Sequence, residues 1–175
     1  MSTTLLYALI LAIAQIVVTL TSYFLGYQTD HIANGRWFSS LAPLVVLIAV
    51  LILGIKAVRD EQPGKGFSYG KGLLTGFLIT LFSSIIITIY TFVHFNYVNP
   101  NFADYAIEAA RMDWAAKGMT ETQMEGAEKF MRGLFKPVAQ SIVGFVIGNI
   151  FGTIISLIVA AFLKREPVGV SNVSV

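Results

Sequence analysis

Long apolar runs dominate the chain, and polar residues are confined to the segments between them. Four runs reach about 20 residues, the length at which a helix crosses the ~30 Å hydrocarbon core of a bilayer. They cover approximately residues 4–27, 37–55, 72–97 and 137–163, and they contain no Asp, Glu, Lys or Arg. Because each run is continuous rather than alternating, we expect helices and not barrel strands. The pattern predicts an all-α polytopic membrane protein, with residues 1–175 forming a single four-helix transmembrane domain.

The first apolar run is expected to remain as a permanent span. Residues 1–4 carry no Lys or Arg, and the run continues well past Ala14. A cleaved signal peptide has a basic start and a shorter apolar region of about 7–15 residues.

Composition agrees with a membrane protein. Apolar and aromatic residues make up 55% of the chain and charged residues only 13%, whereas soluble domains average roughly 25% charged residues. Too few charges are present to cover a water-soluble core. The net charge of +2 offers no basic excess for a nucleic-acid backbone, so we expect no nucleic-acid partner.

The connection at residues 98–136 is the one substantial polar segment, and its pattern predicts a helical hairpin. Pro100 ends the third span, and Gly118 separates two stretches with helical periodicity. Thr120 and Gln123 have the spacing of a capping box at the start of the second helix. The hairpin either caps the bundle or binds a partner. Its candidate contacts with a partner or with lipid are Trp114, Met124, Met131 and Phe135.

Basic residues near the span ends predict the orientation. The two sides of the membrane carry equal numbers of Lys and Arg, but the positive-inside rule gives weight to those in short loops beside span ends. Lys56, Arg59, Lys71, Lys164 and Arg165 meet that condition on one side. We therefore expect a multi-pass protein of the bacterial inner (cytoplasmic) membrane, with both termini in the cytoplasm and residues 98–136 outside.

Small residues recur every four positions in the third and fourth spans, a pattern that permits close helix packing in lipid. The predicted packing residues are Gly72, Gly76, Thr80 and Ser84 in the third span and Gly144, Gly148, Gly152 and Ser156 in the fourth. The two faces are expected to pack against each other within one chain. The alternative is that the glycine face of the fourth span forms a homodimer.

The spans contain no residue suited to catalysis or ion coupling. Intramembrane charges usually mark such functions, and none is present. His31 and His94 lack the spacing of a metal motif, serines lack a nucleophile-elbow context, and Gly64 and Gly66 do not spell a nucleotide-binding loop. We expect no metal, no cofactor and no enzymatic activity. The two histidines are expected to be interfacial residues without a ligand.

Several segments together resemble a known family. Residues 66–71 (GFSYGK) open the third span, residues 99–102 (NPNF) follow it, and residues 118–124 (GMTETQM) precede residues 129–131 (KFM). This layout resembles the bacterial four-span membrane family named domain of unknown function forty-one ninety-nine (DUF4199). The resemblance implies four spans with a helical third connection, and it implies no catalytic residue. Asn99 is a departure, because family members often carry an acid before this proline.

The expected function is that of a non-enzymatic accessory, anchoring or regulatory subunit that acts by protein–protein association. Expected partners are membrane lipids together with another membrane protein or further copies of the chain. Two alternatives remain open: a small-molecule or lipid transporter working as a homo-oligomer, and a membrane helper of a glycosyltransferase acting on a lipid-linked sugar.

Overall fold

The computed structural model describes residues 2–61 and 63–166. Its helices are α1 (Thr3–Phe24), α2 (Arg36–Asp60), α3 (Tyr69–Val93), η1 (His94–Val98), α4 (Phe102–Ala116), α5 (Glu121–Leu134) and α6 (Pro137–Leu163). No strand occurs among these described residues, and α1, α2, α3 with η1, and α6 are long and apolar enough to span a membrane. The predicted all-α fold with four spans is confirmed.

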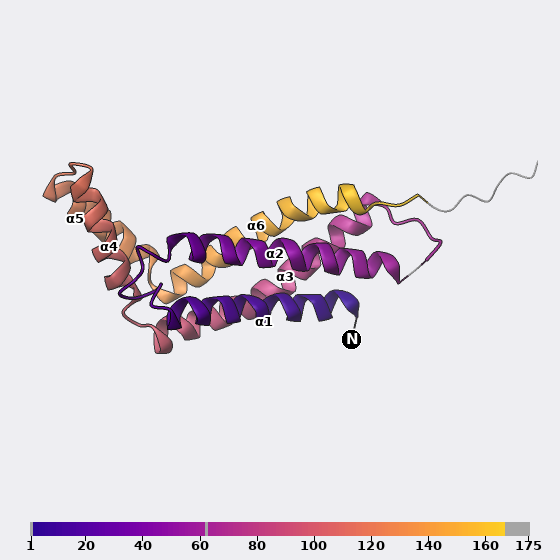
Figure 1. The fold of residues 1–175 in the computed structure, drawn as a ribbon, viewed down its shortest axis with the longest axis horizontal. Helices are drawn as coiled ribbons and strands as arrows, with labels where there is room; N and C mark the ends of the chain where they lie inside the picture. The colour runs from indigo at the N-terminus through magenta and orange to yellow at the C-terminus, as the bar shows by residue number, and fades with distance from the viewer. Residues whose placement is uncertain (1, 62, 167–175) are drawn as a thin grey trace, which may run out of the picture.

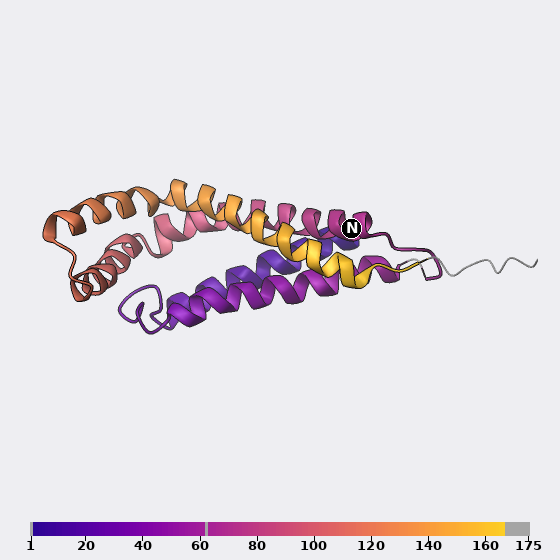
Figure 2. The ribbon, with the colours of Figure 1, turned by 90° about the horizontal axis from the view of Figure 1, so that it is seen from above.

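The four spans lie side by side as an elongated bundle, with the α4–α5 hairpin at one end (Figures 1 and 2). We call this the hairpin end, and we call the opposite end, which carries Ser2 and Glu166, the terminal end. The most extensive contact joins α3 and α6, followed by those of α1 with α3 and α2. Towards the hairpin end the spans separate into two antiparallel pairs, α1–α2 and α3–α6 (Figure 2).

The apolar core lies in the terminal half of the bundle. Leu11, Leu51, Ile55 and Ile79 are almost completely buried there. Phe67 and Arg165 exchange two backbone hydrogen bonds of 2.7 and 2.9 Å, which attach the loop before α3 to the end of α6. The two helix pairs are thus closely joined at the terminal end.

Small residues bring α3 and α6 together in an antiparallel register. A Cβ atom added at Gly72 would lie 3.0 Å from the Cβ of Ala160, and one at Gly76 would lie 2.7 Å from that of Ser156. One turn further along, a Cβ at Gly152 would lie 2.8 Å from that of Thr80. Hydrocarbon supplies no hydrophobic drive for helix association, so this close backbone approach is what packs the pair.

Exposed aromatic side chains mark the hairpin end of the spans. Phe24, Trp37 and Tyr97 lie at or near the ends of α1, α2 and η1, and all three are largely exposed. Amphipathic aromatic rings favour the headgroup layer of a bilayer. The α4–α5 hairpin extends beyond the ends of α1 and α2 (Figure 2).

Candidate functional site

A groove opens between the two helix pairs in the half of the bundle nearer the hairpin. Its volume is about 470 Å³, and residues of α1, α2, α3 and α6 line it. We call it the span groove; its walls include Leu11, Gln15, Leu44, Leu47, Ser83, Ile87, Ser141, Gly144, Gly148 and Phe151. It lies at the depth of the spans, so its surroundings are apolar.

Two glycines of α6 keep the span groove open. A Cβ atom added at Gly144 or Gly148 would meet no heavy atom within 4 Å. The prediction that these two positions pack against the third span is therefore wrong for the single chain, because α6 turns its small-residue face from α3 to the groove beyond Gly152. Ser84 still contacts α6, since Asn149 Nδ2 donates to Ser84 Oγ at 2.9 Å.

Most of the hydroxyl groups beside the groove are already used as donors. Ser83 donates to the Thr80 carbonyl at 2.9 Å, and Thr88 and Ser141 donate to the carbonyls four residues earlier in their helices. Gln15 Nε2 donates across to the Pro43 carbonyl of α2 at 2.8 Å. Satisfied in this way, these side chains add little polarity, and the groove is suited to an apolar ligand.

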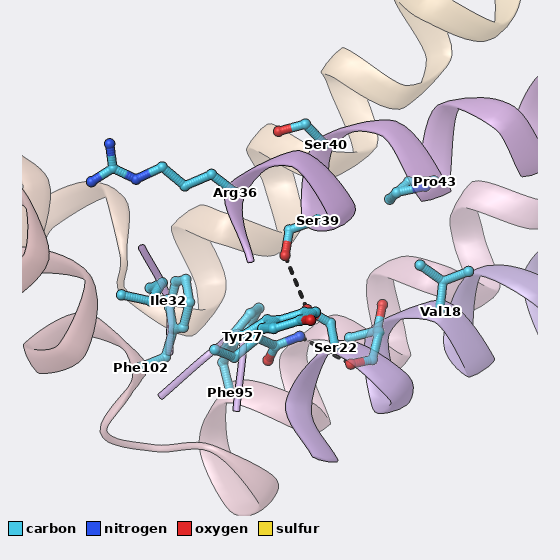
Figure 3. Close-up of a pocket in the computed structure, with 12 residues that line it drawn as sticks. Val18, Ser22, Tyr27, Ile32, Arg36, Ser39, Ser40, Pro43, Phe95 and Phe102 are labelled. Carbon is cyan, nitrogen blue, oxygen red and sulfur yellow. Dashed lines mark hydrogen bonds between the residues drawn. The ribbon is translucent and has the colours of Figure 1, made fainter. Parts of the chain in front are cut away.

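A second cavity adjoins the span groove at the hairpin end. It has a volume of about 420 Å³, and Thr19, Ser40 and Pro43 line both spaces. We call it the loop pocket; its other walls include Ser22, Tyr27, Gln28, Ile32, Arg36, Ser39, Phe95 and Phe102. Figure 3 shows Ser22 and Ser39 facing each other, 3.0 Å apart, with the Arg36 side chain extending away from them.

Arg36 connects this pocket with the hairpin. Its guanidinium lies 2.6 Å from the Asp113 carboxylate of α4, and both side chains remain about half exposed, at 53% and 43%. The edge of the loop pocket therefore carries one cation and one anion, both within reach of water.

A buried polar network closes the hairpin end beside the loop pocket. His94 is fully buried; its Nε2 lies 2.8 Å from Gln28 Oε1 and its Nδ1 lies 3.1 Å from the Tyr90 hydroxyl. Gln28 Nε2 donates to the Thr19 carbonyl, which leaves its Oε1 as an acceptor. His94 Nε2 therefore carries the proton and Nδ1 accepts from Tyr90.

His94 was expected to be an interfacial residue without a ligand, and the structure adds that both of its ring nitrogens are hydrogen-bonded within the chain. The network begins where α3 widens into the π-helical turn η1, whose Asn99 N–H donates to the His94 carbonyl. Asn99, the position at which the chain departs from the family pattern, is itself buried and donates from Nδ2 to the Gln28 carbonyl at 3.1 Å. A carboxylate could not make that bond.

The α4–α5 hairpin has an interior of its own. Ile107 and Met124 are buried, and Ile107 lies one turn before Arg111, on the face of α4 that pairs with α5. Phe135 packs edge-on against Phe102 with ring centroids 5.4 Å apart. Trp114 and Met131 are partly buried. Of the proposed contact residues, Met124 is therefore withdrawn from the surface of the chain. The most exposed large apolar residues of the hairpin are instead Phe130, at 68%, and Met112, at 62%.

Ion pairs join the two helices of the hairpin. Arg111 pairs with Glu121 and Glu128, and Arg132 pairs with Glu128 and Asp104. Hydrogen bonds from Arg132 and Arg111 hold the pKa of the Glu128 carboxyl below its ordinary value. These charges do more than solvate a surface, because they connect α4 to α5.

Across residues 2–61 and 63–166, no group of three or more His, Asp or Glu side chains is placed to hold a metal ion. His31 is exposed in the loop between α1 and α2, whereas His94 is enclosed by its network. The structure does not bring the two histidines into a shared metal site.

Comparison with known families assigns the chain to one family. The family described as "Protein of unknown function (DUF4199)" matches residues 6–165. The chain belongs to the DUF4199 family. The resemblance seen in the sequence is therefore confirmed over nearly the whole chain, while the family description assigns no activity. No curated protein and no solved structure matches the chain.

Sequence reasoning missed the groove and Gln28, which connects His94 to α1. The groove depends on the point at which two helices separate, and small-residue spacing does not reveal that point. Gln28 lies after the first apolar run, where an isolated amide carries no motif. Only the polar character of Gln28 and His94 at the ends of apolar spans could have indicated a network.

Proposed function

We propose that this protein is a non-enzymatic accessory subunit of a bacterial inner membrane that acts by associating with another membrane protein through the α4–α5 hairpin. In this proposal both termini are cytoplasmic and the hairpin lies outside. The positions of Lys56, Arg59, Lys71, Lys164 and Arg165 beside the span ends support that orientation.

The observation that carries the proposal is that the hairpin is closed inside and yet leaves large apolar side chains exposed on its polar outer surface. Its internal face is filled by Ile107 and Met124, and ion pairs join its helices. Phe130 and Leu134, one turn apart on α5, are nevertheless exposed. Large exposed apolar side chains on a self-contained polar element are typical of contact surfaces.

The position of the hairpin supports association rather than capping. It extends beyond the ends of α1 and α2 (Figure 1), and the residues that line the span groove belong to the spans and not to α4 or α5. Few contacts join α5 to α6, and α4 is attached to the spans mainly through the Arg36–Asp113 pair and the Phe95–Phe102 contact. The outward faces of α4 and α5 are therefore available to a partner.

The test is copurification in mild detergent from cells that express the tagged protein at its native level. A stoichiometric partner is expected with the unaltered chain and is lost when Met112→Ser and Phe130→Ser are combined. The matched control combines Glu108→Ser and Lys129→Ser, two exposed polar positions on the same helices, and retains the partner. Equal recovery of the partner with both double variants would contradict the proposal.

A further inference from the structure

We propose that the span groove and the loop pocket together bind one phospholipid molecule, with an acyl chain in the groove and a zwitterionic phosphoethanolamine headgroup at the Arg36–Asp113 pair. The inference is independent of any protein partner of the hairpin. It rests on the length and volume of the groove, its lining, the loop pocket that adjoins it and the charges at the edge of that pocket.

The length and volume of the groove suit one hydrocarbon chain. Along α6 the groove extends from Ser141 to Phe151, roughly 15 Å at 1.5 Å per residue. Its volume is about 470 Å³. An unbranched chain can lie along a groove of this length and contact all four spans.

The lining of the groove also favours a hydrocarbon. Leu44, Leu47 and Phe151 present apolar surface, and the hydroxyl groups of Ser83, Thr88 and Ser141 donate to their own helices. Most ligand sites are likewise apolar with a few polar groups that fix orientation. An unbranched chain gains close packing against the bare backbone at Gly144 and Gly148, which is the interaction that matters where lipid is the solvent.

The polar end of the site is the charged edge of the loop pocket. The pocket adjoins the groove, since Thr19, Ser40 and Pro43 line both, and it lies near the ends of the spans, where exposed aromatic residues mark the headgroup layer. Its lining is mainly apolar, and its edge carries the Arg36–Asp113 pair. A molecule that lies along the groove and reaches this pair is apolar along most of its length and charged at one end, which is the chemistry of a membrane lipid.

Charge complementarity selects the headgroup. The Arg36 guanidinium can bind a phosphate, while the Asp113 carboxylate beside it repels a purely anionic headgroup. A phosphoethanolamine group carries both a phosphate and an ammonium, so each charge of the half-exposed pair gains an opposite partner. A choline headgroup has no N–H donor for Asp113. The pair therefore favours phosphatidylethanolamine over phosphatidylglycerol and phosphatidylcholine.

The test is native mass spectrometry of the full chain released from nanodiscs that contain equal amounts of these three phospholipids. One retained phosphatidylethanolamine per chain is expected. Gly148→Leu fills the groove and is expected to lower retention roughly tenfold, since a loss of about 1.4 kcal/mol is tenfold in a binding constant. Ala161→Leu adds the same side chain at an exposed position of α6 and is expected to leave retention unchanged. Thermal unfolding of both variants verifies that they fold.

The headgroup assignment is tested with Arg36→Gln and Asp113→Asn. Arg36→Gln is expected to lower retention of all three lipids, and Asp113→Asn to remove the preference for phosphatidylethanolamine over phosphatidylglycerol. Lipid retention by folded Gly148→Leu equal to that of Ala161→Leu would overturn the assignment of the span groove as the acyl-chain site. A dimer that Gly148→Leu alone dissociates would identify a second copy as the occupant and overturn the proposal. Equal retention of the three phospholipids by the unaltered chain would overturn the assignment of a phosphoethanolamine headgroup.

Discussion

His94 and Gln28, 66 residues apart in the chain, share a hydrogen bond of 2.8 Å between Nε2 and Oε1 at the hairpin end of the bundle. The bond attaches the loop after α1 to the end of α3, the two segments that border the loop pocket. Since His94 has no solvent exposure, removing one partner leaves the other buried without a bond.

Replacement of His94 by Leu is therefore expected to destabilise the protein. The side-chain Oε1 of Gln28 and the Tyr90 hydroxyl lose their partner, and an unsatisfied buried polar group costs about 1–3 kcal/mol. Denaturant unfolding in detergent micelles measures the loss. The control His31→Leu alters an exposed histidine and should unfold as the unaltered chain does; equal stability of the two variants would show that the network contributes nothing.

Gly152→Ala and Gly144→Ala form a matched pair on α6. The first places a Cβ 2.8 Å from that of Thr80, so α3 and α6 must separate, at a cost of roughly 1–3 kcal/mol. The second meets nothing within 4 Å, and its better helix propensity makes it neutral or stabilising by up to about 1 kcal/mol. The unfolding midpoints of the two variants are to be compared side by side. A loss of stability in Gly144→Ala as large as that in Gly152→Ala would contradict the packing of α6 against α3.

Acid is expected to loosen the hairpin. The pKa of Glu128 in the folded chain is lowered from its ordinary 4.5 by hydrogen bonds from Arg132 and Arg111. The stabilising contribution of Glu128 is therefore fully present above about pH 4.5 and is lost as pH falls through the lower, folded-state value. Glu128→Gln should remove this dependence.

The fluorescence of Trp114 reports on the hairpin once Trp37, the other tryptophan, is changed to Phe. Thermal transitions followed by this signal should shift downward at acidic pH in the Trp37→Phe background. Adding Glu128→Gln should flatten the shift. An unchanged acid shift after that substitution would assign the dependence to another group.

The orientation can be tested with single cysteines, because the chain contains none. Thr122→Cys in α5 should react with an impermeant maleimide in intact cells, whereas Lys65→Cys in the loop before α3 should react only after lysis. The opposite pattern would invert the proposed topology.

The four helices were predictable from the sequence. A long uncharged run in lipid must satisfy its backbone hydrogen bonds within the segment, and a continuous apolar run does so as a helix. The contact of Gly72, Gly76 and Gly152 with the neighbouring span follows the spacing that suggested it. That spacing continues unchanged through Gly148 and Gly144, so it could not indicate where the contact ends and the groove begins. The direction in which α6 leaves α3 is a property of all four helices together.

Side-chain exposure in the hairpin was less predictable for a similar reason. The sequence made Met124 and Met131 candidate contacts with a partner, yet Met124 is buried and Met131 is partly buried. The helical spacing of apolar residues identifies which side chains share a face of the helix. It does not indicate how far the neighbouring helix covers each of those side chains. Phe130 was not among the candidate contact residues, although it is the most exposed large apolar residue of α5.

The most direct test of the proposed function is site-specific photocrosslinking in living cells. A photoreactive phenylalanine at position 130 is expected to form a crosslink to one membrane protein, and the same residue at position 112 should crosslink to the same protein. At position 124, inside the hairpin, it should form none. Crosslinks from position 130 to lipid alone, with no protein adduct at either exposed position, would contradict association through the hairpin.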